Sequence, residues 1–307
     1  MSTVRTKRSK ANFNDLYVQP DPRRLYTSLR TLDYRIAELA LPVVANVHAG
    51  GTVLDVCCSY GVGAAQLRYT LSIADLTVRY RDPALADLDP LALVAADRKF
   101  FAARDQRREV RVVGLDASTP AIRYALNVGL MADGWAEDLE RSEPSAALTA
   151  GLAGVSTITC TGGVGYVGAA TFRRILDAHP DTTNLRAILF ILRVFDYAEI
   201  VQAFADRGLV AESLPGVTFP QRRFANAAEQ DSAMRDLADR RIDAVGREDS
   251  GWFHANCVVI RPAVEVARVP IGELTARISA QLAPTLVQPG MSDDLGPERR
   301  PGRGPAW

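Results

Sequence analysis

Short, apolar, β-rich runs alternate along this chain with longer stretches of helical periodicity, and this alternation most constrains its fold. Four of the β-rich runs are TVLDVCC, EVRVVGLDAS, VSTITCTGG and RAILFILRVF. Each is followed by a segment that we expect to be helical. Strands that alternate with helices predict an α/β fold with a doubly wound, mostly parallel sheet between two layers of helices. We expect seven strands.

The end of the predicted sheet differs from the rest. The late β segments LVAESLPGVTF and HANCVVIRP are expected to form a terminal antiparallel hairpin, because no helix is predicted after the second of them. The main domain is predicted over residues 21–265, with helical segments near 21–48 and 70–109. We expect a flexible N-terminal segment over residues 1–20. A disordered tail is expected over residues 283–307, which are rich in Pro, Gly and charge.

Composition excludes several classes of function. The chain has 307 residues, of which 48% are hydrophobic, and 36 basic residues balance 36 acidic ones. A formal net charge of zero gives no electrostatic footprint for nucleic acid or an acidic membrane. No apolar run approaches membrane-spanning length, and the few Cys and His residues lack the spacing of a metal site. We therefore expect a soluble, cytoplasmic protein without a metal; a homodimer is compatible with the sequence.

The stretch VLDVCCSYGVG indicates a ligand site. Its apolar run ends at Asp55, and a turn of small residues with glycine at Gly61 and Gly63 leads into a predicted helix. Small side chains allow a ligand to approach the backbone closely, and ligands of open parallel sheets bind beyond the carboxyl ends of the strands. The next strand ends at Asp116, whose carboxylate can accept the hydrogens of both hydroxyl groups of a ribose.

Two cofactors are compatible with this arrangement. A dinucleotide favours Gly-x-Gly-x-x-Gly, so that backbone amides can bind its pyrophosphate. The corresponding residues here are C-C-S-Y-G-V-G, which fail that pattern. S-adenosylmethionine has no phosphate, and the acid at the end of the first strand suits its ammonium group. The turn therefore favours S-adenosylmethionine over a nicotinamide dinucleotide.

The stretch VLDVCCSYG resembles the first motif of the class I, Rossmann-like S-adenosylmethionine-dependent methyltransferases, hydrophobic-hydrophobic-Asp-x-Gly-x-Gly-x-Gly. On that alignment Asp55 is the acid, Cys57 and Ser59 replace the first two glycines, and Gly61 keeps the third. VVGLDAS resembles the second motif, which binds ribose and adenine, and WAEDLE resembles the third, at the adenine edge. TITCTGGVGYV resembles the fourth strand and the loop where methyl transfer takes place. The cofactor-binding residues expected from these motifs are Asp55, Cys57, Cys58, Ser59, Tyr60, Gly61, Asp116, Ala117, Ser118, Glu137, Asp138, Leu139, Thr161 and Gly162.

The resemblance covers roughly residues 50–262 and has clear departures. The interval between Asp55 and Asp116 is longer than the family's norm, which implies a helical insertion. No Asn/Asp-Pro-Pro-aromatic sequence follows the fourth strand, and this argues against amino-group methylation of nucleobases or glutamine. The acceptor stays open.

Candidate catalytic and substrate-binding residues lie in several segments. Tyr166, in the loop after the fourth strand, is expected to close over the transferring methyl, and His254 is a candidate general base. Arg193, Arg222 and Arg223 could bind a substrate carboxylate in a bidentate fork. The resemblance further implies a lid in the N-terminal segment, formed by Tyr17 and Tyr26.

The sequence therefore predicts a methyltransferase that acts on a small molecule at an oxygen nucleophile. A carboxylate would need no general base, because it is already ionised at neutral pH. Three alternatives stay open: aminocarboxypropyl transfer or cyclisation of the same cofactor, a non-catalytic cofactor-binding subunit, and a nicotinamide-dependent oxidoreductase, which the turn disfavours.

Overall fold

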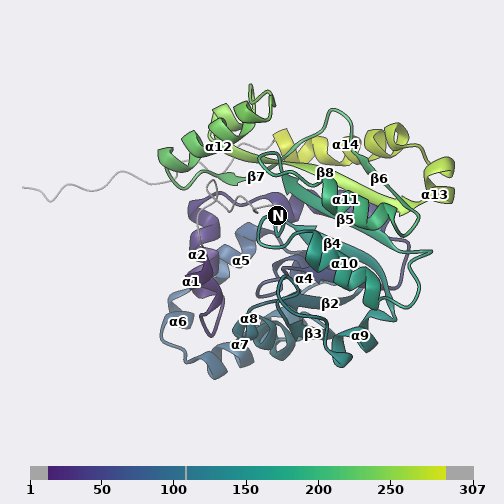
Figure 1. The fold of residues 1–307 in the computed structure, drawn as a ribbon. Helices are drawn as coiled ribbons and strands as arrows, with labels where there is room; N and C mark the ends of the chain where they lie inside the picture. Colours follow the sequence, from purple (N-terminus) through teal and green to yellow (C-terminus); the bar gives the residue numbers. More distant parts are fainter. Residues whose placement is uncertain (1–12, 108, 288–307) are drawn as a thin grey trace, which may run out of the picture.

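An eight-stranded sheet forms the centre of the molecule (Figure 1). The computed structural model describes residues 13–107 and 109–287. The strands follow the order β3-β2-β1-β4-β5-β8-β6, and β7 pairs with β8 beside this path. Their bounds are β1 Thr52–Val56, β2 Arg111–Asp116, β3 Asp133–Ala136, β4 Val155–Thr161, β5 Arg186–Leu192, β6 Leu209–Ser213, β7 Phe219–Arg223 and β8 Trp252–Pro262. The pairs that join β1 to β5 are parallel, as the alternating sequence predicts.

The antiparallel end of the sheet is built on β8. This strand runs antiparallel to β5, β6 and β7. Ala255 pairs with Leu192 of β5 and with Phe219 of β7, so β7 lies on the side of β8 away from β5. The predicted fold class is confirmed, but the sheet has eight strands instead of seven. LVAESLPGVTF breaks into two elements because its Pro-Gly pair makes a turn, with Gly216 at φ +73°.

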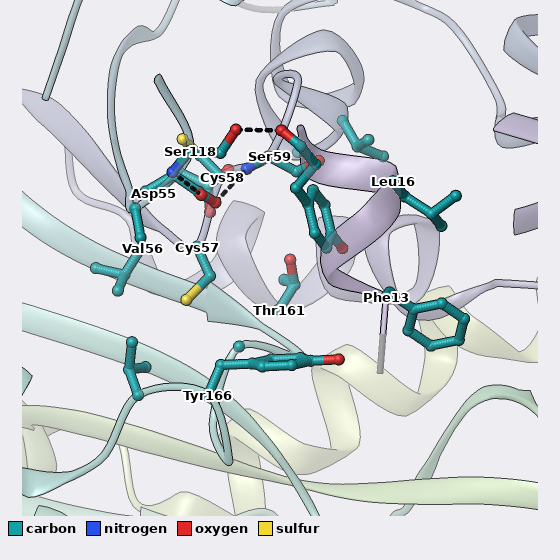
Figure 2. A pocket seen from close by; sticks show the side chains of 18 of the residues that line it. Phe13, Leu16, Asp55, Val56, Cys57, Cys58, Ser59, Ser118, Thr161 and Tyr166 are labelled. Carbon is teal, nitrogen blue, oxygen red and sulfur yellow. Dashed lines mark hydrogen bonds between the residues drawn. The ribbon is translucent and has the colours of Figure 1, made fainter. Parts of the chain in front are cut away.

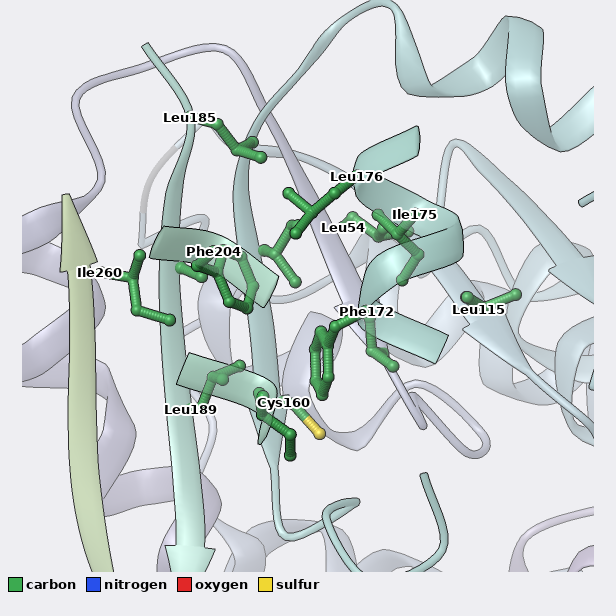
Figure 3. Close-up of a cluster of buried hydrophobic side chains, with 14 of the residues drawn as sticks. Leu54, Leu115, Cys160, Phe172, Ile175, Leu176, Leu185, Leu189, Phe204 and Ile260 are labelled. Atoms are coloured by element: carbon green, nitrogen blue, oxygen red, sulfur yellow. The ribbon is translucent and has the colours of Figure 1, made fainter. Parts of the chain in front are cut away.

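Helices cover both faces of the sheet, and the side chains of each strand alternate between them. Leu54 belongs to a core on one face of the sheet, and its neighbour Val53 belongs to a core on the opposite face. Figure 3 shows the first of these cores, where Phe172 and Phe204 pack over the sheet. The first face carries α9 Ala146–Leu152, α10 Ala169–Ala178 and α11 Ala198–Ala205. The opposite face carries α3 Ile36–Val47, α4 Val62–Arg68, α8 Thr119–Asn127, α12 Ala227–Asp239 and α14 Ile271–Val287.

The predicted helical segments before β1 and between β1 and β2 are confirmed. The first, near residues 21–48, contains α2 Arg23–Thr31 and α3, with α1 Asn14–Tyr17 before it, and the second contains α5 Ile73–Tyr80, α6 Pro83–Ala86 and α7 Pro90–Ala102. Asp97 of α7 is fully buried and accepts hydrogen bonds from Arg79 of α5 and Tyr124 of α8. The bond from Arg79 joins two helices of the insertion, and the bond from Tyr124 attaches the insertion to the main domain. The remaining elements are the 3-10 turn η1 Glu248–Ser250 and α13 Ala263–Arg268.

The predicted ends of the chain fall partly outside the described residues. The segment predicted to be flexible covers residues 1–20. Residues 1–12 of it lie outside the described residues, and the rest contains α1. Of the predicted tail, residues 288–307 lie outside them, whereas α14 continues to Val287. The division into these segments stays a prediction. Among the helices described, none is long and apolar enough to cross a membrane.

Candidate functional site

A cavity of about 650 Å³ opens at the carboxyl ends of β1, β2 and β4, where the sheet order reverses direction. This is the place where ligands of doubly wound sheets bind, and the volume falls within the range of small-molecule sites. Its walls come from the turn after β1, the ends of β2 and β3, the loop after β4, helices α1 and α2, and strand β7. Figure 2 shows Asp55, Cys57 and Cys58 on one side of it and Leu16 and Phe13 on the other.

The turn after β1 keeps the backbone of a glycine-rich loop without its first two glycines. Cys57 and Ser59 have φ angles of +58° and +54°, and Gly61 has φ +84°. These are the positions at which the methyltransferase motif has glycine. A left-handed conformation costs a residue other than glycine about 1–2 kcal/mol, so the surrounding structure must stabilise the turn.

Asp116, at the end of β2, holds this turn in place. Its Oδ2 accepts a hydrogen bond from the Ser59 amide at 2.9 Å, and its Oδ1 accepts one from the Ser118 amide at 2.9 Å. Burial raises the pKa of the carboxyl group, and the two amide bonds oppose that rise. Each carboxylate oxygen has two lone pairs. Asp116 therefore keeps capacity to accept two further hydrogens from a ligand in the cavity.

Asp55, at the end of β1, is almost completely buried and also lines the cavity. Its Oδ1 accepts a hydrogen bond from Thr159 Oγ1 at 3.2 Å. A Cβ atom added at Gly63 would lie 2.7 Å from its Oδ2, so the carboxyl group needs the glycine beside it. Burial raises the pKa of Asp55 to about 7. A cationic ligand group would therefore favour loss of this proton.

The segment after β3 forms part of the cavity wall. Glu137, Asp138 and Leu139 all line the cavity. The Glu137 carboxylate already accepts hydrogen bonds from the amide and hydroxyl of Ser145, which caps α9. Asp138 is half-buried; its Oδ1 accepts one hydrogen bond, from the Glu140 amide at 3.0 Å, and its Oδ2 lies 3.4 Å from Arg141. Asp138 is thus the more available of the two acids.

The loop after β4 approaches the turn after β1 closely. A Cβ atom at Gly163 would lie 2.7 Å from Sγ of both Cys57 and Cys160, so no larger residue fits there. Contact with the Cys160 thiol, together with burial, raises the pKa of the Cys57 thiol, which therefore stays protonated. A protonated thiol is a weak nucleophile, so Cys57 lines the cavity without thiol chemistry. Thr161 and Gly162 also line the cavity.

Three tyrosines from distant parts of the chain surround one end of the cavity: Tyr17, Tyr34 and Tyr166. Burial raises the pKa of Tyr166 to about 12, and it raises the pKa of Tyr17 as well. Tyr34 donates a hydrogen bond to the Thr161 carbonyl at 3.3 Å. All three side chains are therefore neutral phenols at physiological pH, which can position a substrate but do not act as bases.

The N-terminal segment covers the cavity and is tied to the cofactor-motif residues. Ser118 Oγ donates a hydrogen bond to the Tyr17 carbonyl. The Tyr60 hydroxyl shares its hydrogen between the carbonyls of Leu16 and Gln19, at 2.8 and 2.7 Å. Tyr60 is buried and, like Gly61, does not line the cavity. It therefore lies behind the cavity wall, although the motif predicted it among the cofactor-binding residues.

Tyr26, predicted to share the lid with Tyr17, is placed elsewhere. Its ring stacks on Tyr80 of α5 at a centroid distance of 4.6 Å, within the core beside the insertion. The cavity-facing residues of α2 are Leu25, Ser28 and Leu29. Helical spacing accounts for this difference, because Leu25 and Ser28 face the cavity while Tyr26 points about 100° away from Leu25.

His254 does not line the cavity. It is half-buried on β8, opposite Pro220 of β7, with Nδ1 3.1 Å from the Thr218 hydroxyl. Burial, aided by Arg193 and Arg247, lowers its pKa to about 4. The ring is neutral at physiological pH, but the structure does not bring it to the site.

The three candidate arginines all have other partners. Arg193 is buried and pairs with Glu248 at 2.6 Å, outside the cavity. Arg223 is exposed, lies over the Trp252 ring and is 3.8 Å from Asp33. Only Arg222 of this group lines the cavity, and it forms a buried bidentate pair with Glu229 at 2.7 and 2.9 Å. None of them is placed as the free carboxylate fork that the sequence suggested.

Several residues of the cavity were missed at the level of sequence. Tyr34, Gln221 and the apolar residues of the N-terminal segment, such as Phe13 and Leu16, line it. Neither Tyr34 nor Gln221 belongs to a motif. The Pro-Gly pair of LVAESLPGVTF could have indicated a turn with a further strand after it. This pattern would not have predicted the direction of the Gln221 side chain.

No protein-family model matches the sequence, and neither does any curated protein. Solved structures similar to the chain include a TehB-like SAM-dependent methyltransferase from Corynebacterium glutamicum, at 14% identity and a TM-score of 0.39 over 76% of this chain and 94% of that one. Magnesium protoporphyrin IX methyltransferase from Synechocystis with bound SAM gives 12% and 0.35, over 83% and 86%. DesVI of Streptomyces venezuelae gives 13% and 0.39, over 83% and 100%. At these values the likeness is distant, and the fold assignment rests on the sheet order of this chain.

Proposed function

We propose that this protein is an S-adenosylmethionine-dependent methyltransferase that acts on an oxygen of a small molecule. The observation that supports this most is the left-handed turn of Cys57, Ser59 and Gly61, hydrogen-bonded to Asp116 at the edge of the cavity. Cys57 and Ser59 keep the left-handed conformation although their side chains disfavour it, which indicates that the shape of the turn is required. Strain of this kind is concentrated at functional sites.

The residues present fit the cofactor. Asp116 would accept the ribose hydroxyls, and Ala117 with Asp138 would lie beside the adenine. Asp55 would pair with the ammonium group, with the backbone of Cys57 along the methionine portion. The turn lacks the three glycines that normally allow the pyrophosphate of a dinucleotide to approach the backbone.

When bound, the cofactor would supply a methyl group on a positively charged sulfur. The acceptor oxygen would form a bond to the methyl carbon as the carbon–sulfur bond breaks, and the electrons of the broken bond would stay on sulfur. The protein's part is to hold the acceptor in line with that bond in a cavity shielded from water. Tyr166 and Tyr17 are neutral, so they orient the acceptor and exclude water. A carboxylate acceptor would already be ionised, and a hydroxyl acceptor would lose its proton to solvent before it enters the cavity, so no residue of the cavity has to act as a general base.

Product analysis tests the proposal. The protein is incubated with methyl-labelled S-adenosylmethionine and a panel of small hydroxyl compounds, and products are separated chromatographically. We expect labelled acceptor in equal amount to S-adenosylhomocysteine. Methylthioadenosine as the nucleoside product would instead show aminocarboxypropyl transfer or cyclisation, and tight cofactor binding with no product from any acceptor would favour a non-catalytic subunit.

A matched pair of variants tests the roles of the site residues. Tyr166→Phe should lower turnover, because the loop residue faces the cavity. His254→Ala should leave both cofactor affinity and turnover near the wild-type values, because the ring lies outside it. Loss of turnover in His254→Ala with normal cofactor affinity would show that a base is essential and would contradict the base-free mechanism.

A further inference from the structure

Strand β7 places two consecutive side chains, Gln221 and Arg222, in the cavity. Side chains of a regular strand alternate between its faces, yet both residues are buried and both line the cavity. The register against β8 shifts between Pro220 and Arg222, so Gln221 is the extra residue of a β-bulge. Bulges are common beside active sites, where they redirect a side chain.

The bulge is fixed from the backbone side. The Gln221 carbonyl accepts a hydrogen bond from the Arg35 amide at 2.8 Å, and the Leu32 carbonyl accepts one from the Arg223 amide at 2.7 Å. A Cβ atom at Gly162 would lie 2.1 Å from Gln221 Nε2, so the loop after β4 has a glycine where the amide approaches it. The side-chain amide of Gln221 therefore lies against the loop after β4, while the backbone of the bulge is bound to the segment between α2 and α3.

The Gln221 amide has unused hydrogen-bonding capacity. Its residue is only 2% exposed, and Oε1 has no hydrogen-bond partner. A buried polar atom without a partner is destabilising by about 1–3 kcal/mol, and such atoms are rare. Rotation about the last side-chain bond exchanges oxygen and nitrogen, so the amide can present an acceptor or a donor to the cavity.

The charges nearby are neutralised. Arg222 is 3% exposed, pairs with Glu229 through two hydrogen bonds, and lies between the rings of Phe13 and Phe253 at 5.1 and 4.9 Å. An anionic substrate would have to compete with Glu229 for this guanidinium, at the expense of a buried ion pair. The part of the cavity around Gln221 therefore disfavours a carboxylate.

Much of the cavity wall is apolar or aromatic, including Phe13, Leu16, Leu29, Leu32, Tyr34 and Tyr166. Such a surface binds a hydrophobic body, and its tyrosines suit a flat ring.

We propose, on the basis of the proposed function, that the acceptor is a flat, uncharged, largely apolar molecule with a phenol-like or enol-like hydroxyl group, which Gln221 positions. The neutral hydroxyl donates to Gln221 Oε1. The phenolate-type anion, which loses its proton to solvent before it enters the cavity, accepts a hydrogen bond from Nε2 of the rotated amide, and its oxygen then takes the methyl group. Gln221 is thus a specificity-determining residue. This assignment favours an acceptor with a hydroxyl group over the carboxylate acceptor considered from the sequence.

Calorimetry on protein saturated with S-adenosylhomocysteine tests this assignment with three probes on one ring system: 2-naphthol, 2-naphthoate and 2-methoxynaphthalene. We expect 2-naphthol to bind about threefold to tenfold more tightly than 2-methoxynaphthalene, the difference that one hydrogen bond gives. We expect 2-naphthoate to bind more weakly than both. In Gln221→Leu the preference for 2-naphthol over 2-methoxynaphthalene should disappear while S-adenosylhomocysteine affinity is unchanged.

The control variant is Gln202→Leu, on the exposed face of α11, which should keep the wild-type preference. If Gln221→Leu does not fold, Gln221→Asn retains an amide that is too short to reach and should show the same loss. The assignment is overturned if 2-naphthoate binds as tightly as 2-naphthol, if the preference survives in the Gln221 variants, or if no probe binds to cofactor-saturated protein. Failure of the proposed function looks different, because wild-type protein would then not bind S-adenosylhomocysteine at all.

Discussion

At the scale of single residues, Cys57 and Ser59 occupy a backbone conformation that glycine adopts far more readily. Their amides and carbonyls still form the turn, because Asp116 receives the Ser59 amide and the Leu115 carbonyl accepts the Cys57 amide at 2.8 Å. Substitution at Cys57 therefore separates the requirement for backbone shape from the chemistry of the thiol.

Cys57→Gly should change the free energy of unfolding by less than about 1 kcal/mol, since relief of the left-handed strain offsets lost packing and a more flexible unfolded chain. Cys57→Val should destabilise the protein by more than about 2 kcal/mol, because a β-branched residue strongly disfavours this conformation. Chemical denaturation measures both. Equal stability of the two variants would show that the turn is not held in the left-handed region.

Arg222 has a structural role in this account. Arg222→Met should destabilise the fold by about 3–5 kcal/mol, because Glu229 would be left buried without its partner. The double variant Arg222→Met with Glu229→Gln should recover much of this loss. Denaturation of the four proteins completes a double-mutant cycle. A stable single variant that has merely lost substrate affinity would instead return Arg222 to the role of a substrate anchor.

At the scale of elements, the N-terminal segment around α1 is linked to the cofactor motifs by two hydroxyl groups. Tyr60 and Ser118 both donate to its backbone carbonyls, and Ser118 also caps α8. Since the turn and the lid share these residues, order in one should be transmitted to the other.

Tyr60→Phe should loosen the N-terminal segment without unfolding the core, because it removes one hydroxyl and keeps the ring packing. Amide exchange at residues 14–19 should become faster, whereas exchange in β1 and β4 should stay unchanged. Tyr69→Phe is a matched control, because that side chain makes no recorded hydrogen bond through its hydroxyl within the described residues. Unaltered exchange at residues 14–19 in Tyr60→Phe would contradict the link.

The same scale shows why the sequence predicts part of this site and not the rest. Asp55 and Asp116 were predictable, because apolar runs reveal where parallel strands end and such ends meet at one edge. Gln221 was not, because a bulge changes the direction of a side chain without leaving a pattern in the sequence. The arginines were assigned wrongly as free groups because their pairing leaves no local pattern: Glu248 lies 55 residues from Arg193, and Glu229 lies seven residues from Arg222 on the helix after β7. His254 was predicted near the site because it comes just before the part of β8 that pairs with β5. In the structure β7 pairs with this end of β8, and His254 lies outside the cavity.

At the scale of the whole molecule, the cavity couples ligand binding to pH. Burial raises the pKa of Asp55 to about 7, above its ordinary value near 4. Between these values the folded protein binds this proton more readily than the unfolded chain does. The contribution of Asp55 to the stability of the ligand-free protein is therefore present at low pH and is lost as the pH rises through about 7.

Binding of an ammonium group to the Asp55 carboxylate should show the opposite trend. The affinity for S-adenosylhomocysteine should rise several-fold between pH 6 and pH 7.5, because the ionised form of Asp55 becomes more populated. Asp55→Asn should flatten this dependence. A wild-type affinity that stays constant over this range would show that Asp55 does not pair with the ligand's ammonium group.

One nucleoside should lie across the tips of β1 and β2, with its ribose on Asp116. Isothermal titration of the wild-type protein and of Asp116→Asn with S-adenosylmethionine measures whether it does. We expect one binding site per chain in the wild type and an affinity at least about tenfold lower in the variant, since hydrogen bonds to a charged acceptor contribute about 1.5–3 kcal/mol. Absence of binding heat in the wild-type protein at several temperatures, or equal affinity in a folded Asp116→Asn protein, would contradict it.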